Sequence, residues 1–170
     1  MKLQKIDKVL YRKRLNILIA ISITVLLVSS LSISNILITL FGSNIDGDNF
    51  WWNISGVAVG LLIVMGQFKV LVSKPFMLEV NYVRQLKQEM NRIYRHSKKV
   101  QAGVDANNKT ALIISYFNLQ ASKQVYELDN NTLTMDELNE KIQRLDDKLE
   151  NLGLVISASD YDANLLATLD

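Results

Sequence analysis

The sequence predicts an all-α membrane protein, in which a two-helix transmembrane hairpin is followed by a small cytoplasmic helical domain. There are two long apolar runs, residues 15–41 and 50–72. The first contains no charged residue, and the second contains only Lys69. Only eight residues separate the runs. Gly and Pro are scarce, at 7 and 1 of 170 residues, so we expect few long loops and a mostly helical remainder.

The first run has 27 residues, which as a helix would extend about 40 Å, enough to cross a hydrocarbon core of about 30 Å. It follows a basic segment, residues 1–14, that contains six Lys and Arg. A cleaved signal peptide is the rival interpretation. The run is too long for such a peptide, however, and no small-x-small cleavage motif follows it.

The second run has 23 residues, enough for one crossing, and Lys69 near its end can extend its ammonium to the lipid headgroups. The turn between the spans, residues 42–49, contains Asp46 and Asp48 but no Lys or Arg. Because Lys and Arg concentrate on the cytoplasmic side, both basic flanks of the hairpin should be cytoplasmic and the turn external. Phe50, Trp51 and Trp52 would form an aromatic belt at the outer interface.

Small residues form one face on each span. Gly56 and Gly60 make a G-x-x-x-G pattern, and Ser30 and Ser34 have the same spacing. The two faces could pack on each other within one hairpin, or the glycines could face a second copy of the chain. Neither span has an ionisable residue at its centre, which argues against a proton-coupled transporter. An oligomeric pore lined by the serine face of the first span remains an alternative function.

Apolar residues at helical spacing predict an amphipathic helix from Pro75 to Val100. Its polar face is basic, and we expect it to contact the headgroups of an anionic inner leaflet rather than nucleic acid. Alternatively, the acidic C-terminal helices fold back onto it. The six basic residues are Arg84, Lys87, Arg92, Arg95, Lys98 and Lys99. His96, the only histidine, lies among these cations and suggests no metal site.

A turn is expected at residues 103–108, followed by a helix over 109–128 that is capped by Asn107 or Asn108. Thr134 and Glu137 fit a capping box for the next helix. That helix has an apolar seam that Gly153 should end, and a last short helix would start at Asp160 or Asp162. Residues 75–170 would thus form the cytoplasmic domain, and its acidic C-terminal helices could bind a protein partner.

The chain has no Cys and no catalytic or phosphate-binding motif, so we expect no enzyme activity, metal or cofactor. Its strong charge asymmetry does not suggest a substrate either. Residues 1–99 have 14 Lys and Arg against 5 Asp and Glu, and residues 100–170 have 5 against 12. A membrane-anchored interaction or scaffold protein, able to self-associate through its spans, is the function that this pattern favours.

The chain also resembles a family of small bacterial two-span inner-membrane proteins of unknown function. The resemblance implies a location in the inner membrane and two spans, but no mechanism. The segments that carry it cover most of the chain: KLQKIDKVLYRKRLN, LLVSSLSIS, GDNFWWNISGV, NYVRQLKQEMNRIYR and LDNNTLTMDELNEK.

Overall fold

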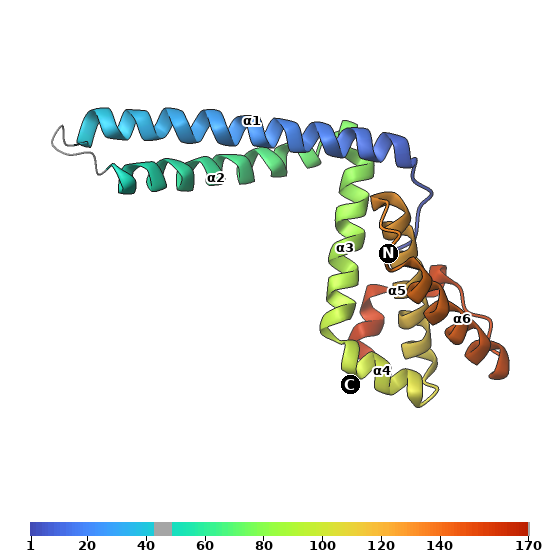
Figure 1. Cartoon of the computed structure of the whole chain (residues 1–170). Helices are drawn as coiled ribbons and strands as arrows, with labels where there is room; N and C mark the ends of the chain where they lie inside the picture. Colours follow the sequence, from blue (N-terminus) through green and yellow to red (C-terminus); the bar gives the residue numbers. More distant parts are fainter. Residues whose placement is uncertain (43–48, 170) are drawn as a thin grey trace. The chain divides into compact units, whose positions relative to one another are not determined.

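The structure, a computed structural model, describes residues 1–42 and 49–169, and within these it is helical and contains no strand (Figure 1). The all-α prediction is therefore confirmed for the part of the chain that is described. The helices are α1 (Lys8–Phe41), α2 (Phe50–Val72), η1 (Pro75–Met77), α3 (Leu78–Arg95), α4 (Ser97–Asp105), α5 (Lys109–Asp129), α6 (Met135–Asn151), η2 (Ala158–Asp160) and η3 (Ala163–Thr168).

The chain forms two compact units. One, the hairpin unit, is Val9–Asn81, and the other, the helical unit, combines Met1–Lys8 with Tyr82–Asp170. The first residues of the chain thus belong to the same unit as the last helices. The predicted domain division at residue 75 stays a prediction, and the sequence offered no reason to place Met1–Lys8 beside residues 82–170.

The hairpin unit is built on α1 and α2, which lie side by side (Figure 1). The bounds of α2 are those of the second apolar run. The first helix begins seven residues before the first run, because Lys8–Arg14 continues it as a charged first two turns. Leu18 of α1 and Val72 of α2 are buried, and so is Met77 just beyond α2.

The helical unit has an ordinary apolar core. The side chains of Leu86, Leu112, Ile114 and Phe117 are almost completely shielded from solvent. The rings of Phe117 and Tyr161 stack with their centroids 4.0 Å apart, which fixes the segment after α6 onto α5. Burying such side chains is the main stabilising contribution available to a unit of this size.

The amphipathic helix predicted over Pro75–Val100 is wrong as a single element. Pro75 begins a short 3-10 turn, and the helix is interrupted at His96, between α3 and α4. His96 Nδ1 lies 2.9 Å from the carbonyl oxygen of Arg92, and its backbone N–H donates to Ile93 in a 3-10 geometry. At the break, the Arg92 carbonyl therefore lies against the His96 ring, and the backbone N–H of His96 bonds three residues back rather than four.

Gly103 is not a turn residue, because α4 continues through it to Asp105. A Cβ at Gly103 would lie 2.5 Å from the Cβ of Ala111, so the glycine allows α4 and α5 to approach closely. The turn is shorter, and Asn108 caps α5 by accepting bonds from Thr110 and Ala111, as one of the two predicted caps.

The predicted capping box at Thr134 is wrong, since that side chain makes no capping hydrogen bond. A capping box occurs instead at Ser157 and Asp160, before η2. The Gly153 prediction is confirmed: its φ of +63° is the left-handed conformation that ends a helix, and Leu154 donates back to Leu149. Asp162, one of the two predicted starts, caps η3 through Asn164.

Candidate functional site

The outer surface of the hairpin unit is apolar. In the most apolar 18-residue window of each of α1 and α2, only 11% of the residues are buried. Leu, Ile, Val and Met side chains cover the exposed faces of both helices. Helices at the core of a soluble protein are mostly buried, and these two are not. By length and composition, both are able to cross a membrane.

The contact between α1 and α2 is built from small residues. Gly56 packs against Ser34, and Gly60 packs against Ser30. A Cβ at Gly56 would lie 2.8 Å from the carbonyl oxygen of Ser30 and 2.8 Å from the backbone nitrogen of Ser34. The two small faces therefore pack on each other within one hairpin. Ser34 Oγ also donates to the carbonyl of Asn53, at 3.3 Å.

Aromatic rings gather at the end of the hairpin that joins the two helices. Phe41 stacks on Trp52 with centroids 5.4 Å apart, and Phe50 meets Trp51 edge to face at 5.6 Å. Phe50 and Trp51 are largely exposed. Asp46 and Asp48, predicted to mark the external turn, lie outside the described residues. Rings at one level of an apolar hairpin suit a membrane interface.

An ion pair ties the other end of the hairpin unit. The Arg14 guanidinium on α1 donates to the Glu79 carboxylate on α3, and both side chains are mostly buried. The same guanidinium lies over the Phe76 ring, 5.0 Å from its centroid. Arg14 thus links the residues before the first helix run to those after the second. In the sequence, Arg14 is one of six basic residues before the first run, and no pattern indicates its pairing with Glu79.

The first residues of the chain are fastened to the helical unit by three hydrogen bonds, which we call the Gln4 clamp. The backbone N–H of Gln4 donates to Tyr82 Oη at 2.8 Å, and the Gln124 side chain donates to the Gln4 carbonyl at 2.5 Å. Tyr82 Oη donates in turn to Gln124 Oε1 at 2.9 Å. Burial raises the pKa of Tyr82, although its two hydrogen bonds oppose the shift. No sequence pattern indicated this contact.

The six predicted headgroup-contact residues are divided between two helices. Arg84, Lys87, Arg92 and Arg95 lie on α3, and Lys98 and Lys99 follow the break on α4. All six are exposed. Lys87 lies 2.6 Å from Asp129 at the end of α5, and Arg92 lies 3.8 Å from Glu89. Their contact with lipid stays a prediction.

Glu89 on α3 also accepts a hydrogen bond from the hydroxyl of Tyr161, at 2.5 Å. Burial, followed by the bond to this carboxylate, raises the pKa of Tyr161 well above its usual range. The phenol therefore stays protonated at neutral pH and acts as a donor that fixes the C-terminal segment. This pair is a structural contact rather than an acid–base site.

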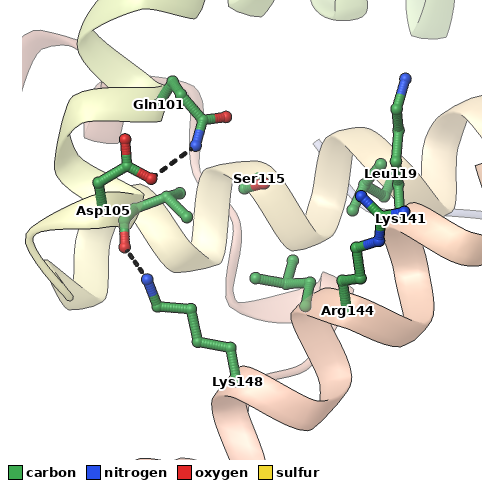
Figure 2. A pocket seen from close by; sticks show the side chains of 9 residues that line it. Gln101, Asp105, Ser115, Leu119, Lys141, Arg144 and Lys148 are labelled. Carbon is green, nitrogen blue, oxygen red and sulfur yellow. Dashed lines mark hydrogen bonds between the residues drawn. The ribbon is translucent and has the colours of Figure 1, made fainter.

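A groove of about 390 Å³ opens between α4, α5 and α6 (Figure 2). Lys141, Arg144 and Lys148 line one wall, on α6. Lys148 donates to the carbonyl of Val104 at 2.5 Å, while Lys141 and Arg144 bond carboxylates one turn earlier on their own helix. The bond from Lys141 lowers the pKa of Glu137. Each of these three side chains thus has a partner within the helical unit.

Within residues 1–42 and 49–169, no three His, Asp or Glu side chains are placed to hold a metal ion. A family model described as "Protein of unknown function (DUF3087)" matches residues 1–166. No curated protein and no solved structure matches the chain.

Proposed function

The chain belongs to the DUF3087 family of proteins of unknown function, and for this member we propose the role of a membrane anchor: the hairpin spans the membrane twice and holds the helical unit at its surface as a non-enzymatic interaction module. One observation carries this proposal. Two adjacent helices of 34 and 23 residues expose apolar side chains to their surroundings. Exposing such a surface to water costs free energy, whereas contact with lipid chains does not.

The Gln4 clamp supports two crossings rather than one. Gln4 precedes α1 in the chain, and Tyr82 and Gln124 follow α2, yet all three belong to the helical unit. A folded unit lies on one side of a membrane. If α1 and α2 cross it, the chain must therefore leave and return on the same side, which requires an even number of spans.

The charge distribution gives the proposed orientation. Six Lys and Arg precede residue 15, and six more lie between residues 84 and 99, whereas the connecting segment 42–49 has none. By the positive-inside rule, both termini should be cytoplasmic, in an inner membrane. The six basic residues on α3 and α4 would each gain about 1 kcal/mol if they lay near an anionic leaflet.

Membrane extraction tests the anchor. We expect the full-length chain to stay with membranes through urea and alkaline carbonate washes and to dissolve only with detergent. Release of most of the protein by urea would contradict an integral hairpin. For orientation, reporter fusions at Asp170 and Gly47 should give cytoplasmic and external activity, respectively. External activity at Asp170 would reverse the proposed orientation.

The interaction role rests on the helical unit, whose acidic helix α6 has six Asp and Glu over Met135–Asn151. Pull-down of the tagged full-length chain in mild detergent should recover a protein partner or a second copy of the chain. Recovery of neither would contradict the role. The pore alternative stays a prediction: Ser30 and Ser34 are buried against α2 and do not face outward, whereas Ser32 is exposed.

A further inference from the structure

α1 has a second polar face, pointing away from α2. Thr24, Ser32, Asn35 and Thr39 are all exposed. Their spacings of eight, three and four residues place them on one stripe of the helix, since residues three and four apart share a face. Ser30 and Ser34, by contrast, lie against Gly60 and Gly56 of α2. We call the outward set the α1 polar stripe.

Two of the four side chains in this stripe form hydrogen bonds within α1 itself. The hydroxyl of Thr24 donates to the carbonyl of Ala20 at 3.0 Å, and that of Thr39 donates to the carbonyl of Asn35 at 2.8 Å. Within the described residues, the Ser32 hydroxyl and the Asn35 carboxamide make no hydrogen bond. They are the groups that still need a partner.

The depth of Asn35 makes this need costly if the hairpin spans a membrane. Asn35 lies six residues before Phe41, the ring that stacks on Trp52, and is therefore about 9 Å along the helix from the aromatic end. With that end at the interface, the carboxamide lies within the hydrocarbon region. No water satisfies it there, and polar side chains in such positions promote helix association.

We propose that the α1 polar stripe is the surface through which two copies of this chain associate, with Asn35 of one copy bonded to Asn35 of the other. The proposal rests on the membrane-spanning hairpin. All copies share one topology, so a two-fold axis along the membrane normal brings like residues to the same depth. A carboxamide both donates and accepts, so two of them pair reciprocally. The Gly56 and Gly60 face is already occupied within each copy.

Introduced cysteines test this surface cleanly, because the chain has none of its own. Val28→Cys lies on the stripe, four residues from both Thr24 and Ser32. Leu62→Cys on α2 is a matched control. Leu62 lies six residues after Gly56 and Val28 six before Ser34, so the antiparallel contact places them at the same depth. Their exposures, 61% and 65%, are also similar.

In native membranes, oxidation should link Val28→Cys chains into disulfide dimers and leave Leu62→Cys chains monomeric. Equal linking of both variants would indicate random collision and overturn the proposal. Absence of linking in the Val28→Cys chain, or its linking mainly to another protein, would overturn it as well. If the chain is absent from washed membranes, the anchor itself fails, which is a separate result.

The role of the carboxamide is tested in the Val28→Cys background. Asn35→Leu should weaken dimerisation about threefold to twentyfold, the range expected for one interhelical hydrogen bond in a membrane. Asn35→Gln should retain most of it. Thr39→Val should change it little, because that hydroxyl is already bonded within α1. Unchanged linking in Asn35→Leu, with the chain still in the membrane, would show that Asn35 does not hold the dimer.

Discussion

The hairpin unit and the helical unit distribute the same kinds of side chain in opposite ways. In the helical unit, large apolar groups such as Phe117 and Leu86 are inside, and charged residues cover the outside. In the hairpin unit, Gly and Ser make the close contact between α1 and α2, and most Leu, Ile and Val side chains face outward, although a few large groups such as Leu18 and Val72 are buried. The first pattern suits water, and the second suits lipid. The contrast teaches that the side chains exposed on a helix indicate its environment better than its total hydrophobicity does.

The largest expected effect is in the core of the helical unit. Phe117→Ala removes a fully buried ring that stacks on Tyr161, and should cost about 3–5 kcal/mol of unfolding free energy. Thermal unfolding in mild detergent would measure it. Tyr94→Ala, at an exposed aromatic of α3, should have little effect. The Phe117 variant should still fractionate with membranes, because the hairpin does not use this core.

The next effect compares two exposed leucines. Leu62 is 65% exposed on α2, and Leu133 is 96% exposed in the helical unit. Leu62→Arg should cost about 3 kcal/mol of membrane insertion, because it places a charge at the centre of a proposed span. Leu133→Arg should change stability by less than about 0.5 kcal/mol. A membrane-insertion assay would measure the effect of Leu62→Arg, and thermal unfolding would measure that of Leu133→Arg. A harmless Leu62→Arg would mean that α2 faces water.

The helix contact allows a smaller change to be tested. Gly56→Ala puts a methyl group against the backbone of Ser30 and Ser34, and should cost about 1–3 kcal/mol through overpacking. Gly66→Ala on the same helix meets nothing within 4 Å and should be neutral or slightly stabilising. Proteolysis of the detergent-solubilised chain would report the opening of the hairpin. If the Gly56→Ala and Gly66→Ala chains were cleaved at the same rate, α1 and α2 would not pack closely.

The smallest expected effect concerns two tyrosines of the helical unit. It is absent at neutral pH and emerges only at alkaline pH. The pKa values of Tyr82 and Tyr161 are raised above the ordinary 10.0, mainly by burial. The folded state therefore favours the protonated phenols. Their contribution to stability is complete below pH 10 and declines as the pH rises toward the folded-state values. Chemical denaturation between neutral pH and pH 11 should show this loss, and Tyr161→Phe should reduce it. An unchanged decline in that variant would assign it to other groups.

The sequence predicts those features that repeat along the chain. The bounds of α2, the helical character of the remainder and the role of Gly153 all follow from runs, periods and single-residue preferences. The break at His96 was missed, because the apolar periodicity continues across it and no Gly or Pro marks the position. The Thr134 capping box failed even though its residues fit the motif, since a motif does not determine the geometry before a helix.

Contacts between distant residues were also missed. The Gln4 clamp joins polar residues 78 and 120 positions apart, and neither Gln nor Tyr has a periodicity that would reveal it. Arg14 is similar, because its partner Glu79 lies 65 positions away. For the six basic residues, the sequence gives their number and exposure. It could not show that Lys87 lies beside Asp129, which requires the fold.

The Gln4 clamp also has a consequence for biosynthesis. Gln4 is synthesised first, but Tyr82 and Gln124 emerge from the ribosome only after both apolar helices have done so. The helical unit of a membrane-spanning chain therefore completes itself after insertion. If only one of the two helices had inserted, Gln4 and Gln124 would end on opposite sides of the bilayer. The clamp would stay open and the unit would be incomplete, so that folding itself distinguishes chains with both helices inserted from chains with only one.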